Sequence, residues 1–209
     1  MAWEAGADLI EADVWLYRGR LEVRHTKTVR GLPLLWDRWS LGPGWRARLL
    51  LEELLAGAPS EAGLMLDLKG NDPRLPDAML GALDACPRAG HVAVCSRNWP
   101  QVDALAAHEG ITAIHSVGRA HRLRPLLDHL ADHGTQRRVG LSIHQRLLDA
   151  ARVRELRSLA APVITWPVND AALARTLVSW GVEGVISDDL GLVREIVAAR
   201  RDGRYTSNQ

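Results

Sequence analysis

The chain has 209 residues, of which 47% are hydrophobic, so one globular domain accounts for its length better than two separate cores. The formal net charge of +1 gives no field that would attract nucleic acid or a membrane surface. No apolar run in the sequence is long enough for a signal peptide or a membrane span. The two cysteines, Cys86 and Cys95, lie in no metal-ligand pattern, and we therefore expect a cytoplasmic protein.

Short apolar or β-branched runs alternate along the chain with longer amphipathic segments, which predicts βα units around a parallel sheet. Eight runs are predicted as strands: residues 8–14, 21–25, 63–68, 91–96, 112–116, 138–143, 162–167 and 183–187. The segments between the later strands are predicted as helices, and several of them end at Gly or Pro. Because no linker or repeat interrupts this order, we expect one α/β domain over residues 1–209 with a frayed polar tail from about residue 200.

The first two predicted strands are separated only by WLYRGR, which is too short for a crossover helix and suits a hairpin with an Arg-Gly turn. The two strands should therefore be antiparallel neighbours. Pairing about this turn predicts His25 opposite Glu11 and Val23 opposite Asp13. An imidazole would then lie beside two carboxylates.

Period-two alternation places Glu11 and Asp13 on one face of the first strand, and Asp67 and Lys69 on one face at the end of a later strand. Each pair by itself is compatible with an ordinary solvent-exposed face or a strand-end salt bridge. Together the three carboxylates repel one another unless a proton or cation lies between them, and three oxygen donors suit Mg²⁺ or Ca²⁺. Lys69 is one of only two lysines among 26 basic residues, and it could hold a phosphate.

Five motifs carry a resemblance to a known family. They are GADLIEADV at residues 6–14, LEVRH at 21–25, LMLDLKG at 64–70, VITWPVND at 163–170 and GVEGVISDD at 181–189. In this order, and over nearly the whole chain, they resemble the signatures of the glycerophosphodiester phosphodiesterases. The resemblance implies a TIM (β/α)8 barrel and metal-dependent hydrolysis of glycerophosphodiesters, yielding glycerol 3-phosphate and an alcohol.

The resemblance also implies roles for six residues. Glu11, Asp13 and Asp67 would be ligands of a divalent cation, Mg²⁺ or Ca²⁺. His25 would be a catalytic histidine, Lys69 a phosphate contact, and Trp166 a wall of the substrate pocket. The implied partner is a small-molecule phosphodiester or lysophospholipid-type substrate from lipid metabolism, with no nucleic acid and no transmembrane segment.

One departure concerns the first strand of the family, which ends in a His-Arg-Gly motif with a second catalytic histidine. The sequence MAWEAGAD is interpreted instead as the last turn of the following helix with Gly6 as its cap, so we expect the first strand to lie upstream of residue 1. With the hairpin arm set aside, seven parallel strands are predicted where a closed barrel has eight. His115 and His144 fall near strand ends and are considered as substitutes for the missing histidine.

Three hypotheses remain open at this point. The first is an active phosphodiester hydrolase, the second a catalytically impaired pseudoenzyme that still binds metal and phosphodiester, and the third a fragment without function. Asp67 stands where the family has Glu, which resembles the sphingomyelinase D and phospholipase D branch, so that branch is a further alternative. The aspartates Asp188 and Asp189 are predicted to cap the last helix.

Overall fold

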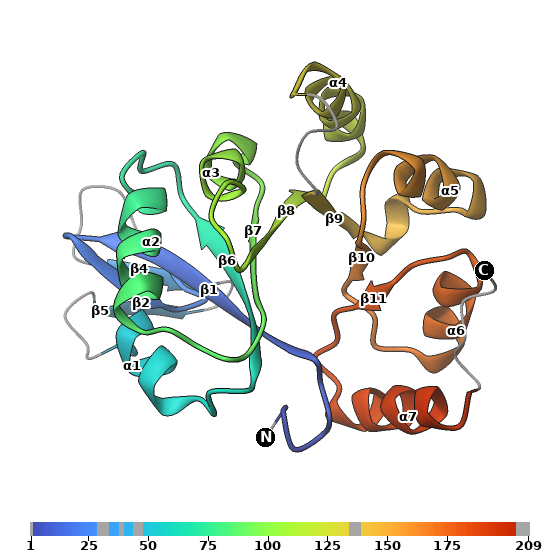
Figure 1. Ribbon diagram of the computed structural model, residues 1–209, viewed down its shortest axis with the longest axis horizontal. Coiled ribbons are helices and arrows are strands. Elements are labelled where there is room, and N and C mark those ends of the chain that lie inside the picture. Colours follow the sequence, from blue (N-terminus) through green and yellow to red (C-terminus); the bar gives the residue numbers. More distant parts are fainter. Residues whose placement is uncertain (1, 29–33, 38–39, 44–47, 134–138, 204–209) are drawn as a thin grey trace.

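Eight strands form one curled sheet in the computed structural model, which describes residues 2–28, 34–37, 40–43, 48–133 and 139–203 (Figure 1). The strands are β1 (Leu9–Tyr17), β2 (Arg20–Val23), β6 (Gly63–Lys69), β7 (Val92–Ser96), β8 (Ile111–Val117), β9 (Val139–His144), β10 (Val163–Trp166) and β11 (Gly184–Val185). Their order in the sheet is β11-β10-β9-β8-β7-β6-β1-β2. All pairs are parallel except the β1–β2 hairpin.

In the part of the chain that the structure describes, seven helices lie around the outside of the strands (Figure 1). They are α1 (Leu51–Gly57), α2 (Leu75–Ala85), α3 (Trp99–Leu105), α4 (Leu123–His133), α5 (Ala150–Leu159), α6 (Ala171–Ser179) and α7 (Leu190–Arg201), with short 3-10 turns at Ala120–Arg122 and Gln145–Leu147. A separate small antiparallel sheet contains β3 (Lys27–Thr28), β4 (Leu34–Asp37) and β5 (Ser40–Pro43), none of which the sequence predicted.

The predicted fold class is confirmed: the chain is an α/β protein with a TIM-barrel-like arrangement that is open on one side. All eight predicted strands are present, with ends shifted by up to three residues. Among the described residues, no strand pairs with the outer edge of β11, and residues 9–12 of β1 pair only with β6. The opening in the cylinder therefore lies between β1 and β11.

The N-terminal segment lies beside α7, close to this opening (Figure 1). The amides of Gly6 and Ala7 donate to the carbonyl oxygens of Trp3 and Ala2, and Gly6 has a φ of 84°. These two hydrogen bonds, with Gly6 in the left-handed conformation, form the Schellman motif that ends many α-helices. Gly6 is therefore a helix cap, as predicted. A two-point ion pair joins Asp8 to Arg200 of α7, at 2.8 and 3.1 Å.

The predicted hairpin is confirmed, but its predicted register is wrong by one residue. Val23 lies opposite Val14 and not opposite Asp13. The reason is the turn itself, because Arg18 and Gly19 both have positive φ values and form a two-residue turn between paired flanking residues. The strand ends at Val23, so no strand pairing places the imidazole of His25.

Alternation along the strands separates the inside of the cylinder from its outer face. On β1 and β6 the side chains of Val14, Leu64, Leu66 and Leu68 point outward into a buried cluster with helices α1 and α2. The inward side chains close the amino-terminal end of the cylinder with a small apolar cluster: Met65, Ala93, Cys95, Ile114 and Ile164. Met65 and Cys95 of this cluster, together with inward side chains nearer the carboxyl ends of the strands, line the pocket described below.

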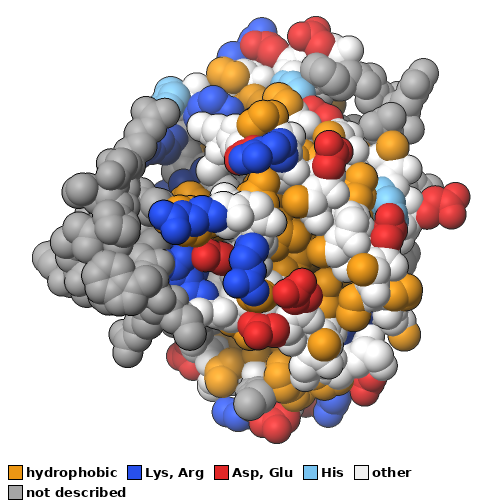
Figure 2. Space-filling model, turned by 90° about the vertical axis from the view of Figure 1, so that its left-hand side faces the viewer, with side chains coloured by type: hydrophobic (Ala, Val, Ile, Leu, Met, Phe, Trp, Pro, Cys, Tyr) orange, Lys and Arg blue, Asp and Glu red, His pale blue; other side chains and the backbone are white. Residues whose placement is uncertain are grey.

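Acidic and basic side chains lie next to one another on the side of the molecule that is to the left in Figure 1, and neither sign of charge dominates it (Figure 2). Among the helices of the described residues, none combines the length and the apolar character needed to span a bilayer.

Candidate functional site

A pocket with a volume of about 790 Å³ opens at the carboxyl ends of the strands. Its lining comes from residues far apart in the sequence, on β1, β6, β7, β8, β9 and β10 and on the segment after β11. All six site residues predicted from the sequence line this pocket: Glu11, Asp13, His25, Asp67, Lys69 and Trp166. In TIM barrels this end of the cylinder is where catalytic residues gather, because the loops after the strands converge there.

Three carboxylates lie together in the pocket. Asp13 on β1 is the register partner of Asp67 on β6, and Glu11 lies two residues before Asp13 on the same face. One carboxylate oxygen from each residue lies within 4.8 Å of the other two. The prediction that the three carboxylates share one location is therefore confirmed in geometry.

Lys69 neutralises part of this negative charge. Its ammonium nitrogen lies 3.0 Å from Oδ1 of Asp13 and also contacts Oδ2 of Asp67. Burial by itself lowers the pKa of Lys69, but the carboxylates of Asp67 and Asp13 outweigh this effect and raise the pKa above its usual value. Lys69 is therefore a cation in this pocket.

One ammonium group does not balance three carboxylates. Although the side chain of Glu11 is open to the pocket, desolvation by the surrounding walls and the charge of Asp13 raise its pKa to about 8. Burial also raises the pKa of Asp67, against the lowering effect of Lys69. The cluster therefore favours either a bound proton or a second positive charge.

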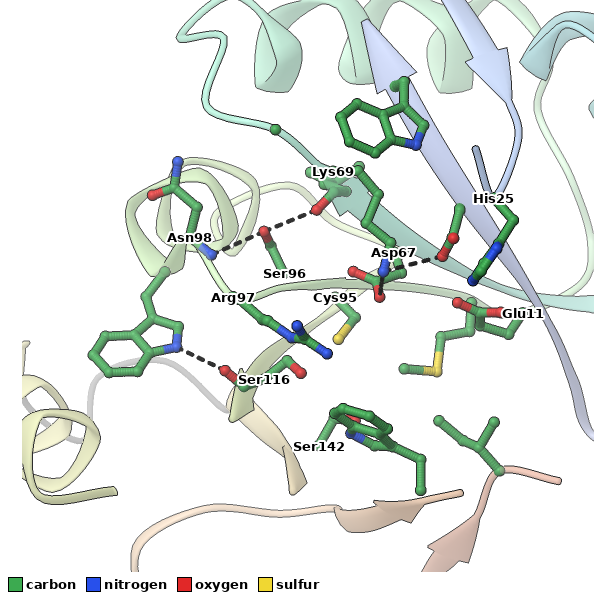
Figure 3. Close-up of a pocket in the computed structure, with 18 of the residues that line it drawn as sticks. Glu11, His25, Asp67, Lys69, Cys95, Ser96, Arg97, Asn98, Ser116 and Ser142 are labelled. Atoms are coloured by element: carbon green, nitrogen blue, oxygen red, sulfur yellow. Dashed lines mark hydrogen bonds and ion pairs between the residues drawn. The ribbon is translucent and has the colours of Figure 1, made fainter. Parts of the chain in front are cut away.

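His25 follows the end of β2 and is exposed, and its ring points into the pocket on the side of Glu11 (Figure 3). It is the one histidine among the described residues that line the pocket. The predicted neighbourhood of imidazole and carboxylates is thus present, although it arises from the loop after β2 and not from strand pairing.

Trp166 at the end of β10 forms part of the opposite wall. Its ring packs edge-on against His144, with centroids 4.9 Å apart, and the guanidinium carbon of Arg97 lies 5.1 Å from its centroid. An aromatic face between two polar groups is a suitable surface for the apolar part of a small ligand.

Sequence reasoning missed Arg97. This residue comes directly after β7, and its guanidinium points into the pocket on the side of Asp67 (Figure 3). The position of Arg97 directly after a predicted strand could have indicated a pocket residue. However, 24 of the 26 basic residues are arginines, so the residue type did not distinguish it from the others. Arg97 and Lys69 together give the pocket two cations that could face an anionic ligand.

The capping prediction for the last helix is correct for Asp189 alone. The carboxylate of Asp189 accepts from the amides of Gly191 and Leu192 at the start of α7. Asp188 lines the pocket instead, which adds a carboxylate that the sequence assigned elsewhere.

Neither substitute histidine is among the described residues that line the pocket. His115 points to the outer face of β8, where its Nε2 lies 2.9 Å from Asp103 of α3. His144 packs against the ring of Trp166. His115 is therefore excluded as a replacement by the alternation of its strand.

The three carboxylates fit a hard divalent cation. Oxygen ligands from Asp and Glu are those that Mg²⁺ and Ca²⁺ prefer, and the raised pKa of Glu11 marks a position where added positive charge is favourable. Glu11, Asp13 and Asp67 are the residues that would hold such an ion.

The fold and the pocket define a class: a TIM-barrel-like α/β protein with acidic and basic side chains gathered at the carboxyl end of its strands. Solved structures of this class cover the chain almost completely. A phosphodiesterase from Oleispira antarctica, in complex with the product sn-glycerol-3-phosphate, matches with a TM-score of 0.71 and 20% identity, over 95% of this chain and 87% of that one. A putative glycerophosphoryl diester phosphodiesterase from Silicibacter pomeroyi matches with a TM-score of 0.73 and 18% identity, over 95% and 86%.

A glycerophosphodiester phosphodiesterase from Thermotoga maritima matches with a TM-score of 0.68 and 17% identity, over 95% of this chain and 88% of that one. The resemblance drawn from the sequence motifs is thus confirmed at the level of the fold: this chain has the fold of the glycerophosphodiester phosphodiesterases. No family model and no curated protein matched the sequence.

Proposed function

We propose that this chain is a member of the glycerophosphodiester phosphodiesterase family and hydrolyses small phosphodiesters with the help of Mg²⁺ or Ca²⁺. The observation that carries the proposal is the group of Glu11, Asp13 and Asp67 beside Lys69 and His25 in one pocket. The same fold in a phosphodiesterase that holds sn-glycerol-3-phosphate supports a glycerophosphodiester as the substrate class.

A divalent cation at the three carboxylates would supply positive charge to a nonbridging phosphate oxygen. Lys69 and Arg97 would hold the remaining phosphate oxygens, because both are cations that face the same part of the pocket. Trp166 would lie against the alcohol part of the substrate and limit the access of water to it.

His25 would transfer a proton to or from an oxygen of the reacting phosphodiester. Its exposed ring lies within the pocket, on the side of Glu11 (Figure 3). A positioned general acid or base contributes about 10² to 10⁴ in rate. Its partner in a two-histidine mechanism is not among the described pocket residues, so we expect slow turnover.

The single histidine among the described pocket residues favours a second candidate function, a protein that binds metal and phosphodiester without hydrolysing the phosphodiester. One histidine in the pocket can serve either the attacking oxygen or the leaving alcohol, and general acid-base catalysis of both steps normally needs two groups. The sphingomyelinase D and phospholipase D branch remains an alternative for the substrate, on the single substitution at Asp67.

We further propose that residues 1–209 act as one domain and that the protein is cytoplasmic. The cytoplasmic location rests on Cys86 and Cys95, both of which are free thiols in the structure.

The test is hydrolysis of glycerophosphocholine and bis(p-nitrophenyl) phosphate with Mg²⁺, with Ca²⁺ and with chelator. His25→Ala should lower metal-dependent turnover by about 10² or more. The matched control is His91→Ala, since His91 is exposed and precedes β7, at the other end of the cylinder. Turnover that chelator does not affect, or that His25→Ala retains, contradicts the hydrolase proposal; tight phosphodiester binding by a folded protein without turnover supports the second candidate.

A further inference from the structure

A second cluster of ligating side chains lies outside the pocket, on the outer face of the cylinder. It contains Asp103 of α3, His115 of β8 and His129 of α4, and we call it the outer cluster. His115 points outward because its neighbours Ile114 and Ser116 point into the cylinder, toward the interior apolar cluster and the pocket. Three elements that are separate in the sequence thus present their side chains to one point between the sheet and its helices.

One carboxylate lies between two imidazoles in the outer cluster. Oδ1 of Asp103 is 2.9 Å from Nε2 of His115, and Oδ2 of Asp103 is 2.9 Å from Nε2 of His129. The ligating atoms of all three residues lie within 4.8 Å of one another. In a tetrahedral zinc site, with Zn–N and Zn–O bonds of about 2.0–2.1 Å, neighbouring ligand atoms lie about 3.3 Å apart. Lengthening these two contacts by about 0.4 Å would therefore bring them to the ligand spacing of a zinc site.

The imidazole rings are held in place by an aromatic neighbour. The ring of Trp99 lies 6.4 Å from that of His115 and 5.3 Å from that of His129, and the two imidazoles meet edge to face at 5.2 Å. Trp99 is itself fixed, since its Nε1 donates to the carbonyl oxygen of Ser116 at 3.1 Å. Ligands whose orientation is set before binding lose little entropy when the ion arrives.

The three side chains of the outer cluster differ in their exposure to solvent. The side chain of His115 is 2% exposed, that of His129 is 14% exposed and that of Asp103 is 27% exposed. An ion could therefore enter on the side of Asp103, where water could supply a fourth ligand. Three protein ligands plus one open position is an arrangement typical of zinc sites that are not purely structural.

We propose that Asp103, His115 and His129 bind a transition-metal ion, Zn²⁺ being the ion that the donors suit best. Two imidazole nitrogens and one carboxylate oxygen favour Zn²⁺ and its neighbours in the first transition row over Mg²⁺ and Ca²⁺, which prefer oxygen donors alone. The ion would link α3, β8 and α4 and would fix α4, which lies above β8 and β9 at the rim of the molecule (Figure 1). This site does not depend on the pocket or on its proposed function.

The experiment is a calorimetric titration of chelator-treated protein with Zn²⁺ in the presence of excess Mg²⁺. The titrated protein carries Asp13→Asn, so that the pocket carboxylates compete less for Zn²⁺. We expect one equivalent of Zn²⁺ to bind, a visible absorption band typical of tetrahedral Co²⁺ when Co²⁺ replaces it, and a rise in Tm with either ion.

Two further substitutions locate the ion. Asp103→Asn removes the charged ligand but keeps the shape of the side chain and an oxygen that accepts from an imidazole, and His129→Ala removes a partly exposed ligand. Each should weaken Zn²⁺ binding by at least about tenfold. Circular dichroism checks that each variant is folded, and Asp103→Asn alone decides the test if His129→Ala does not fold.

The matched control is His108→Ala. His108 also faces a carboxylate, Asp84, with a distance of 3.0 Å, but its side chain is 33% exposed and no second imidazole shares that carboxylate among the described residues. Its Zn²⁺ affinity should equal that of the parent protein. Absence of stoichiometric Zn²⁺ binding, or an affinity that Asp103→Asn leaves unchanged in folded protein, would overturn the proposal.

Discussion

The pocket and the outer cluster are two groups of ionisable side chains that lie on opposite faces of the same sheet. In the pocket, three carboxylates and Lys69 point into the cylinder, and the donors are all oxygen atoms. In the outer cluster, one carboxylate lies between two imidazoles on the helix side of β8. The comparison shows that strand alternation decides where a side chain lies, whereas the donor type decides which cation it suits.

The two groups also differ in how their charge is balanced. In the pocket, desolvation of Glu11 and the neighbouring charge of Asp13 raise the pKa of Glu11 to about 8. In the outer cluster Asp103 already contacts two imidazoles: Nε2 of His115 shares a hydrogen bond with its Oδ1, and Nε2 of His129 lies 2.9 Å from its Oδ2. The carboxylates of the pocket therefore favour an added positive charge. In the outer cluster, a cation would bind between side chains that already contact one another.

The largest expected effect comes from removing a pocket carboxylate. Asp67→Asn should lower metal-dependent phosphodiester hydrolysis by at least about 10³, equivalent to about 4 kcal/mol of transition-state stabilisation, because the cation loses a charged ligand. Asp72→Asn is the control, since Asp72 is a partly exposed carboxylate after β6 that pairs with Arg74. Steady-state rates at saturating Mg²⁺ measure both, and equal rates for the two variants would remove Asp67 from the site.

A somewhat smaller loss is expected for Lys69→Met. The change keeps much of the side-chain length and removes one cation that faces the phosphate, so turnover should fall by about 10² to 10³. Arg20→Met is a suitable comparison, because Arg20 is an exposed cation on the same side of the sheet and does not line the pocket. Unchanged turnover in Lys69→Met would leave the lysine with a structural role only.

The outer cluster can be compared with an exposed pair of the same chemistry in metal-free protein. His115→Ala should lower the free energy of unfolding by about 2–3 kcal/mol, because it leaves a cavity and removes the partner of Asp103. His108→Ala should cost less than about 1 kcal/mol, since its ion pair with Asp84 is exposed. Urea denaturation in chelator measures the two values, and similar costs would mean that the burial of His115 contributes little.

The last expected effect is a pH dependence of stability in chelator. Because the pKa of Glu11 is raised from 4.5 to about 8, the folded state binds more protons than the unfolded state between these values, and stability falls as the pH rises through this range. Glu11→Gln cannot ionise, so it should match the parent protein below about pH 4.5 and be more stable than the parent above about pH 8. Thermal unfolding across this range tests the sign, which would be reversed if Glu11 were stabilised as a carboxylate.

Period-two alternation along each strand was sufficient to predict which charged side chains share a face. It places Glu11 and Asp13 on one face, and Asp67 and Lys69 on another, without knowledge of the fold. The WLYRGR spacing predicts a hairpin because six residues cannot cross a sheet. What spacing could not supply was the register, since only the positive φ of Arg18 and Gly19 sets Val23 opposite Val14.

Other parts of both sites depend on residues that no local pattern connects. Arg97 enters the pocket because β7 lies next to β6, and Asp188 enters because β11 ends on the same rim. His129 joins His115 because α4 packs over β8, and their separation of 14 residues runs from a strand to a helix, so no single strand or helix period connects them. These contacts are consequences of packing, which local periodicity does not encode.

The sequence by itself determined the α/β class, the order of the eight strands along the chain and the carboxylates that share a face, because each of these follows from the local period of side chains. The tertiary structure decided which strands are neighbours, where the cylinder is open and which side chains meet across elements. The physical reason is that hydrophobic burial and strand pairing act between segments far apart in the chain, so the pocket and the outer cluster exist only once the sheet has curled.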